Sequence, residues 1–231
     1  MTKLLSTEHM AEFANSGCLF FEGLIDEDIN KEFLNDIGHT DIDDVDNIQH
    51  YFQNIKSSSS IPRIPAGTAL KDAYPLNSPL EKIFKNEIVS GAINSLVGSK
   101  TVVDHQFLHL TFPSKYYAKA NQRQMSQVNH QDSTIDPRTT FDIQLFYFPT
   151  AVTKEMGGTR YIPGTHLRIV NEMGIEKYQN IKGQKNIICK AGTIGIFHYG
   201  LWHGAGVNFS DDIRYMFKVR LQHTEKQELL W

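Results

Sequence analysis

Hydrophobic residues recur at helical spacing in the first part of the chain. Ser6 is a suitable N-cap for a helix over residues 7–14. Asp26 can cap a second helix. The apolar stripe of that helix is Ile29, Phe33 and Ile37. Between the two helices, the apolar run over residues 18–25 predicts a strand.

A third helix has the clearest start signal. In the stretch Ser78-Pro79-Leu80-Glu81, the serine can cap, the proline suits the first turn and the glutamate can complete a capping box. We expect one helix from here to about Val97, with Gly98 as its stop. Residues 38–77, which precede it, are polar and irregular. They are interpreted as a solvated connector or as a lid over a site.

From residue 101 onward the pattern changes to short strands separated by glycine and proline turns. The predicted strands are residues 101–112, 141–148, 159–162, 186–189, 193–198 and 213–222, with a helical excursion over residues 173–180. Helices followed by many short strands indicate a mainly β fold, either a β-sandwich or an open barrel with N-terminal helices as its buttress. We expect one domain over residues 1–231, with the buttress in 1–100 and the β core in 101–222.

Composition narrows the function classes. The 231 residues carry a net charge of -3, and their Lys and Arg residues are scattered, which argues against nucleic-acid and membrane partners. The two cysteines, Cys18 and Cys189, lie far apart and form no disulfide framework, so a reducing cytoplasm is the expected location. The N-terminus lacks the apolar core of a signal peptide. Oligomeric state is not readable from the chain.

Candidate metal chemistry centres on His130 and Asp132. In an extended segment, residues i and i+2 point the same way, so the imidazole and the carboxylate can converge on one ion. The best third ligand is His203, far enough downstream for the chain to cross a barrel and return. Two histidines and one carboxylate on one face of a metal are typical of non-haem Fe(II) oxygenases. Arg214 follows at the start of the last strong strand, where it could grip a carboxylate.

Five stretches together resemble the phytanoyl-CoA dioxygenase-like family of Fe(II)/2-oxoglutarate-dependent oxygenases. They are His130-Gln131-Asp132, residues 157–166, 191–193, 202–206 and 208–214, and they cover roughly residues 101–222. The resemblance implies a double-stranded β-helix (jelly-roll, cupin-like) core. It implies that the catalytic iron is bound by His130, Asp132 and His203. It also implies that Arg214 holds the distal carboxylate of 2-oxoglutarate and that O2 is the oxidant.

Further site residues follow from the resemblance or from position. Thr111 and Gln144 are expected to touch 2-oxoglutarate. Substrate contacts are expected from His109, Tyr117, Gln124 and Arg160. Lys218 and Arg220 share strand parity with Arg214 and are interpreted as solvated or salt-bridged. One departure from the family is Ala205, where some relatives carry a hydroxyl that contacts 2-oxoglutarate.

The other histidines are weaker candidates for metal ligands. His198 is the nearest competitor of His203 and is interpreted as a hydrogen-bonded strand residue. His105 and His109 alternate on one strand face and could look like a metal pair, but no carboxylate completes them. His166 is expected to structure its loop.

The function that these residues predict is an Fe(II)- and 2-oxoglutarate-dependent dioxygenase that oxidises a small-molecule metabolite, most simply by hydroxylation, with natural-product biosynthesis (secondary metabolism) as the expected setting. Two alternatives are a jelly-roll binding protein without chemistry and a zinc hydrolase with the same ligands. Arg214, and the lack of a His-Glu-x-x-His motif, count against the hydrolase. An intact Asp132 argues against halogenation, because related halogenases carry a small residue there.

Overall fold

A computed structural model describes residues 3–41, 51, 54–55, 61, 64–119, 121–132, 142–168 and 181–223. Its helices are α1 (Thr7–Ser16), α2 (Glu27–Asp36), α4 (Pro79–Lys85), α5 (Glu87–Leu96) and α6 (Ser114–Lys119), with 3-10 turns η1 (Leu70–Asp72) and η2 (Thr165–Leu167). Its strands are β1 (Cys18–Phe21), β2 (Thr68–Ala69), β3 (Thr101–Thr111), β4 (Gln127–His130), β5 (Ile143–Phe148), β6 (Thr159–Tyr161), β7 (Lys185–Asn186), β8 (Thr193–His198), β9 (His203–Ala205) and β10 (Arg214–His223).

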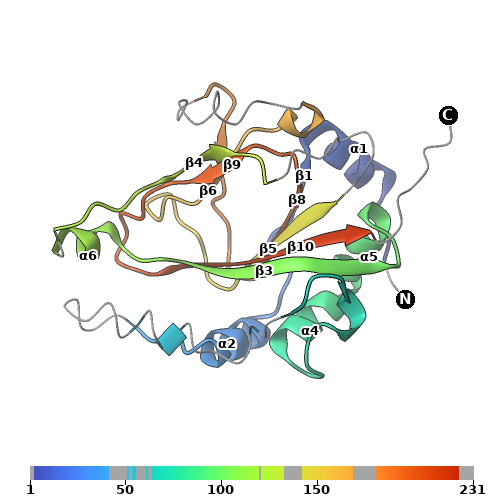
Figure 1. The fold of residues 1–231 in the computed structure, drawn as a ribbon, viewed down its shortest axis with the longest axis horizontal. Helices are drawn as coiled ribbons and strands as arrows, with labels where there is room; N and C mark the ends of the chain where they lie inside the picture. Colours follow the sequence, from blue (N-terminus) through green and yellow to red (C-terminus); the bar gives the residue numbers. More distant parts are fainter. Residues whose placement is uncertain are drawn as a thin grey trace.

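The strands form two antiparallel sheets. The larger has the order β1-β8-β5-β10-β3-β2, and the smaller has the order β4-β9-β6-β7. In Figure 1 the long strands β3 and β10 cross the molecule, the smaller sheet lies on one side of them, and α2 and α4 lie on the other. This arrangement confirms the predicted mainly β fold, with N-terminal helices and a jelly-roll core.

Alternation along β10 separates two cores. The odd-numbered residues Tyr215, Phe217, Val219 and Leu221 are buried in the larger core, against the helices. The even-numbered residues Arg214, Met216, Lys218 and Arg220 point the other way, into the space between the sheets. Phe146 and Phe148 of β5 and Phe197 of β8 line that inner space. The inner face of the larger sheet therefore mixes aromatic rings with three cations.

The third predicted helix is two helices. The chain breaks at Asn86, whose backbone leaves the helical region (ψ 131°), so one helix over residues 78–97 is wrong. The side-chain oxygen of Asn86 accepts hydrogen bonds from the N–H groups of Ile88 and Val89, which makes it the N-cap of α5. Ser78 caps α4 as predicted, but Glu81 accepts from the N–H of Asn77, outside the expected capping box.

Other predicted boundaries shift little. The first strand ends at Phe21, short of residue 25, and the longest strands match their predictions within a residue or two. The helical excursion over 173–180 lies outside the described residues. Of the connector, β2 pairs with the start of β3, while much of residues 42–63 also lies outside the described chain, so the lid stays a prediction.

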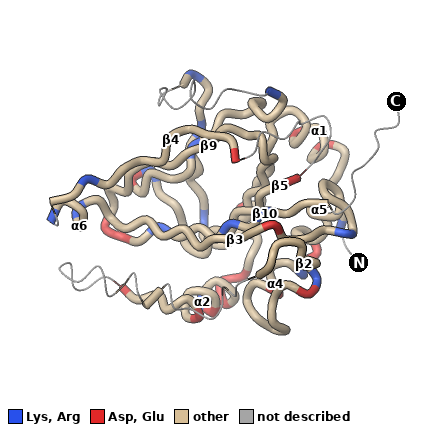
Figure 2. The backbone as a smooth tube through the Cα atoms, viewed as in Figure 1, with Lys and Arg blue, Asp and Glu red and all other residues tan. Residues whose placement is uncertain are grey.

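No described helix is long and apolar enough to cross a membrane. Asp and Glu gather along α2, while Lys and Arg are spread over α6, the long strands and several loops (Figure 2).

Candidate metal centre

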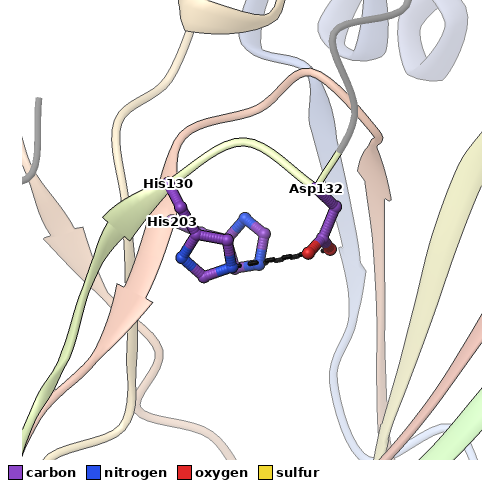
Figure 3. A group of neighbouring side chains, drawn as sticks. All are labelled: His130, Asp132 and His203. Atoms are coloured by element: carbon purple, nitrogen blue, oxygen red, sulfur yellow. Dashed lines mark ion pairs between the residues drawn. The ribbon is translucent and has the colours of Figure 1, made fainter. Parts of the chain in front are cut away.

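Three side chains from two strands and a loop meet at one end of the smaller sheet. His130 ends β4, Asp132 follows it by two residues, and His203 begins β9, whose backbone pairs with β4 at His130. His130 Nε2 lies 3.4 Å from Asp132 Oδ1, and His203 Nε2 lies 3.5 Å from Asp132 Oδ2. One ligand atom from each lies within 4.8 Å of the others. Figure 3 shows both imidazole rings facing the carboxylate.

Both histidines are oriented by backbone carbonyls. His130 Nδ1 lies 2.9 Å from the carbonyl oxygen of Val128, and His203 Nδ1 lies 2.9 Å from that of Leu201. A carbonyl can only accept, so each Nδ1 carries a proton and each Nε2 is left facing the carboxylate of Asp132. Burial lowers the pKa of His203 to about 4, which keeps that ring neutral at pH 7. The Nε2 atoms of the two imidazoles and the carboxylate of Asp132 are a ligand set that fits a divalent transition metal.

Asp132 carries the negative charge of the site. Burial opposes its ionisation, but His130, His203 and Lys218 beside it together hold the pKa of Asp132 below the ordinary value. Lys218 Nζ donates to Asp132 Oδ2 at 2.5 Å. Arg220 Nη2 donates to the backbone oxygen of Asp132 at 2.6 Å. Two cations of β10 therefore position the residue that links His130 to the following loop.

The opposite face of the metal-binding strand is braced by polar residues. Gln131 is buried and its amide donates to the carbonyl oxygens of Gly200 and Arg168. Arg160 of β6 donates to the side chain of Asn129 at 3.2 Å and to the backbone oxygen of Gln127 at 2.6 Å. Because Asn129 and Gln131 alternate with His130 and Asp132, these contacts fix the strand from behind.

A second cationic position lies at the other end of β10. The Arg214 guanidinium donates to Thr111 Oγ1 at 2.9 Å, to the carbonyl oxygen of Met156 at 2.7 Å and to that of Gly157. Thr111 is the direct cross-strand neighbour of Arg214. Burial lowers the pKa of Arg214 to about 10, so it remains charged at pH 7. These partners hold the planar guanidinium of Arg214 in place, so that it can bind a carboxylate inside the barrel. We call this arrangement the Arg214 fork.

Replacing Gly157 with Ala is expected to disturb this fork strongly. Gly157 has φ +59°, and an added Cβ would overlap the carbonyl oxygen of Val207. Overlap with backbone and a strained φ together are expected to cost about 2–4 kcal/mol of unfolding free energy. Gly67→Ala is the matched control, because Gly67 also has a positive φ but its Cβ would meet nothing within 4 Å. Urea denaturation measures both, and equal losses would contradict the clash.

His109 and Gln144 have buried polar atoms on the inner face without partners. Among the described residues, His109 Nε2 and both amide atoms of Gln144 make no hydrogen bond. Gln144 is 0% exposed and lies opposite Arg220, six residues along β10 from Arg214. Its place is therefore near Asp132, away from the Arg214 fork. His109 lies opposite Met216, between the two ends.

Burial of His109 predicts acid sensitivity of the metal-free protein. Burial lowers the pKa of His109 to about 4, below the ordinary 6.5, so the unfolded chain binds the proton more readily. The unfolding free energy that neutral His109 contributes is therefore lost as the pH falls from about 6.5 toward 4. Between pH 7 and pH 5.5, wild type should lose about 1 kcal/mol more unfolding free energy than His109→Gln. Urea melts at both pH values without metal check this, and parallel losses would contradict it.

Three expected substrate contacts have other partners. Arg160 faces away from His203 and braces β4, as described above. The amide of Gln124 donates to the carbonyl oxygen of Phe112 and accepts from the N–H of Asn208, so it ties two loops together. Tyr117 is half-buried and packs against the larger core. These partners follow from strand parity and loop packing that the sequence does not display, and the three substrate contacts stay predictions.

Lys218 is the site residue that sequence reasoning missed. It is 6% exposed and ion-paired with Asp132, so of the two expectations for it, solvation was wrong and salt bridging is confirmed. The sequence did contain one indication of this role, because Lys218 lies on the same face of the last strand as Arg214. Among the remaining histidines, His198 accepts from the N–H of Gly200 and His166 contacts the carbonyl oxygen of Ala14, as loop- and strand-structuring residues do.

Comparisons with known proteins agree with this geometry. The family model described as Phytanoyl-CoA dioxygenase (PhyH) matches residues 13–216. A comparison with curated proteins found no match.

Among solved structures, the chain is similar to the non-heme alpha ketoglutarate dependent carbocyclase SnoK from nogalamycin biosynthesis (TM-score 0.64, 17% identity, covering 96% of this chain and 87% of that one). It is also similar to HygX from Streptomyces hygroscopicus with nickel and 2-oxoglutarate bound (TM-score 0.66, 11% identity, 96% and 88%). A third is the epimerase SnoN in complex with Fe3+, alpha ketoglutarate and nogalamycin RO (TM-score 0.60, 16% identity, 92% and 81%).

Proposed function

The chain belongs to the phytanoyl-CoA dioxygenase family, and from that premise we propose that it is an Fe(II)- and 2-oxoglutarate-dependent dioxygenase that oxidises a small-molecule metabolite. The observation that carries the proposal is the cluster of His130, Asp132 and His203 inside the barrel, with the Arg214 fork on the inner face of the other sheet. A metal site alone would suit several functions. Arg214 is a separate buried cation that can bind the second carboxylate of a dicarboxylate, and this favours the oxygenase.

Each residue has a defined part in this proposal. Nε2 of both histidines and the carboxylate of Asp132 hold Fe(II), while Arg214, with Thr111 as its neighbour, binds the distal carboxylate of 2-oxoglutarate. Bound iron supplies the oxidation chemistry, coupled to conversion of 2-oxoglutarate to succinate and CO2. The aromatic residues Phe146 and Phe197 lie near His203 and keep water from that side of the site.

Hydroxylation is the proposed outcome, because Asp132 is retained where halogenation would need a small residue. The solved relatives include a carbocyclase and an epimerase, so the same frame also serves ring formation and epimerisation. Two of these structures come from nogalamycin biosynthesis, which supports natural products as the substrate class to screen first.

The test is succinate formation from 2-oxoglutarate after anaerobic loading with Fe(II) and exposure to O2. A panel of candidate metabolites is included, because turnover without substrate is slow. We expect no succinate from His130→Ala and a raised 2-oxoglutarate requirement in Arg214→Ala. Absence of both turnover and 2-oxoglutarate binding in the wild type would favour a jelly-roll binding protein instead.

A further inference from the structure

Lys218 is a buried cation whose described ion-pair partner is a metal ligand. It lies on the inner face of β10, opposite Phe107 of β3 and Phe146 of β5. The residue is 6% exposed, and its Nζ lies 2.5 Å from Asp132 Oδ2 and 5.9 Å from the centre of the Phe146 ring. An ammonium group in such a place needs a nearby negative charge.

A metal at the site would compete with Lys218 for that charge. Asp132 Oδ2 faces both His203 Nε2 and Lys218 Nζ, at 3.5 Å and 2.5 Å, so an ion held by His203 comes close to the ammonium. Like charges repel strongly in a poorly solvated interior. Metal binding therefore leaves Lys218 short of negative charge, and an additional anion beside the metal would restore the balance.

Arg214 cannot supply the same subsite. Lys218 follows it by four residues on the same strand face, about 13 Å along the strand. The Arg214 guanidinium is held by Thr111, while the Lys218 ammonium is held by Asp132. The Arg214 fork and Lys218 are therefore expected to bind different anionic groups.

Gln144 supplies a second, independent observation at the same place. It is 0% exposed, and neither amide atom has a hydrogen-bond partner among the described residues. On β5 it lies two residues before Phe146, the direct neighbour of Lys218, which puts it within diagonal reach of a long lysine side chain. A buried amide without a partner is unfavourable unless a ligand completes it. An amide N–H beside an ammonium is a donor set for a carboxylate.

We propose that Lys218 and Gln144 form a second carboxylate-binding subsite, beside the metal and separate from the Arg214 fork. The inference rests on the proposed function, because it requires a metal at Asp132. The carboxylate can come from two sources, the C1 carboxylate of 2-oxoglutarate or a carboxylate on the substrate. The subsite thus predicts either tighter binding of 2-oxo acids or a preference for carboxylic-acid substrates.

The first arm tests 2-oxo acids without turnover. The protein is loaded with Ni(II), and 2-oxoglutarate and 2-oxopentanoate, which lacks the distal carboxylate, are titrated by calorimetry. If Lys218 holds the C1 carboxylate, Lys218→Met should weaken both ligands by the same factor, on the order of tenfold. Lys218→Arg should retain most of the affinity, and Gln144→Leu should give a smaller, parallel loss.

The second arm tests a substrate carboxylate. Hexanoate and its neutral match hexanamide are titrated into the Ni(II)-loaded protein saturated with 2-oxoglutarate. If the subsite serves the substrate, wild type should bind hexanoate on the order of tenfold tighter than hexanamide, and Lys218→Met should abolish that preference. In this case the 2-oxo acids of the first arm bind wild type and Lys218→Met equally.

Metal affinity decides between a subsite and a merely structural lysine. Without any carboxylate ligand, Lys218→Met should bind Ni(II) more tightly than wild type, because the repulsion is removed. Weaker Ni(II) binding would show that Lys218 only positions Asp132, and would overturn the subsite, as would two arms without change. If wild type binds Ni(II) but no 2-oxoglutarate, the proposed function fails, while hexanoate against hexanamide on the Ni(II) protein still tests the subsite.

Discussion

Asp132→Ala is expected to abolish turnover and, less obviously, to destabilise the metal-free protein. Loss of a direct ligand should lower succinate formation by more than about 100-fold, since even the partners of metal ligands contribute 10–100-fold. Independently, the variant leaves Lys218 buried without its carboxylate. Breaking one side of a buried ion pair costs about 3–5 kcal/mol of unfolding free energy. Urea denaturation without metal measures this loss.

A double variant separates the two effects of Asp132→Ala. Combining it with Lys218→Met removes the unpaired cation, so most of the lost stability should return while metal binding stays absent. His130→Ala serves as the control that loses the metal but keeps the ion pair. Equal instability of the single and double variants would show that the pair with Lys218 contributes nothing to the metal-free fold.

Much of the fold could be predicted from local sequence patterns, because these patterns depend on contacts between residues that are only a few positions apart. Ser78 caps α4 by reaching the N–H of Glu81, and this contact depends only on neighbouring residues. Alternation brings His130 and Asp132 to one side for the same reason. The break at Asn86 also used a local cap, but an apolar stripe continued through it and masked the signal.

The side-chain neighbours that the sequence did not predict depend on pairing between strands that lie far apart in the chain. Nothing near Lys218 in the chain shows that its face is closed by Phe146 of β5, because that neighbour is set by the register of β10 on β5. Arg160 faces away from the metal for a similar reason, since β6 pairs with β9 so that Tyr161, not Arg160, lies opposite His203. Residue types near a motif therefore suggest contacts, but the register decides toward which face each side chain points.

Arg214→Leu is expected to reduce 2-oxoglutarate binding while leaving metal binding intact. A buried, charge-assisted fork is lost, and truncating one partner of such a pair costs about 2–5 kcal/mol, or roughly 30-fold to more than 1,000-fold in Kd. Metal affinity without 2-oxoglutarate should hardly change, because Arg214 contacts Thr111, Met156 and Gly157, none of which is a metal ligand. Calorimetry with Ni(II) first and 2-oxoglutarate second measures both constants.

Two graded variants test whether geometry or charge dominates at Arg214. Arg214→Lys keeps the charge but loses the planar fork, so its Kd should lie between those of wild type and Arg214→Leu. Thr111→Val removes one acceptor that orients the guanidinium, and about a tenfold rise in Kd is expected. Were Arg214→Leu to bind 2-oxoglutarate like wild type, the distal carboxylate would have to be held elsewhere. The buried guanidinium would then serve only to join β10 to the loop that carries Gly157, and the oxygenase proposal would lose its main support.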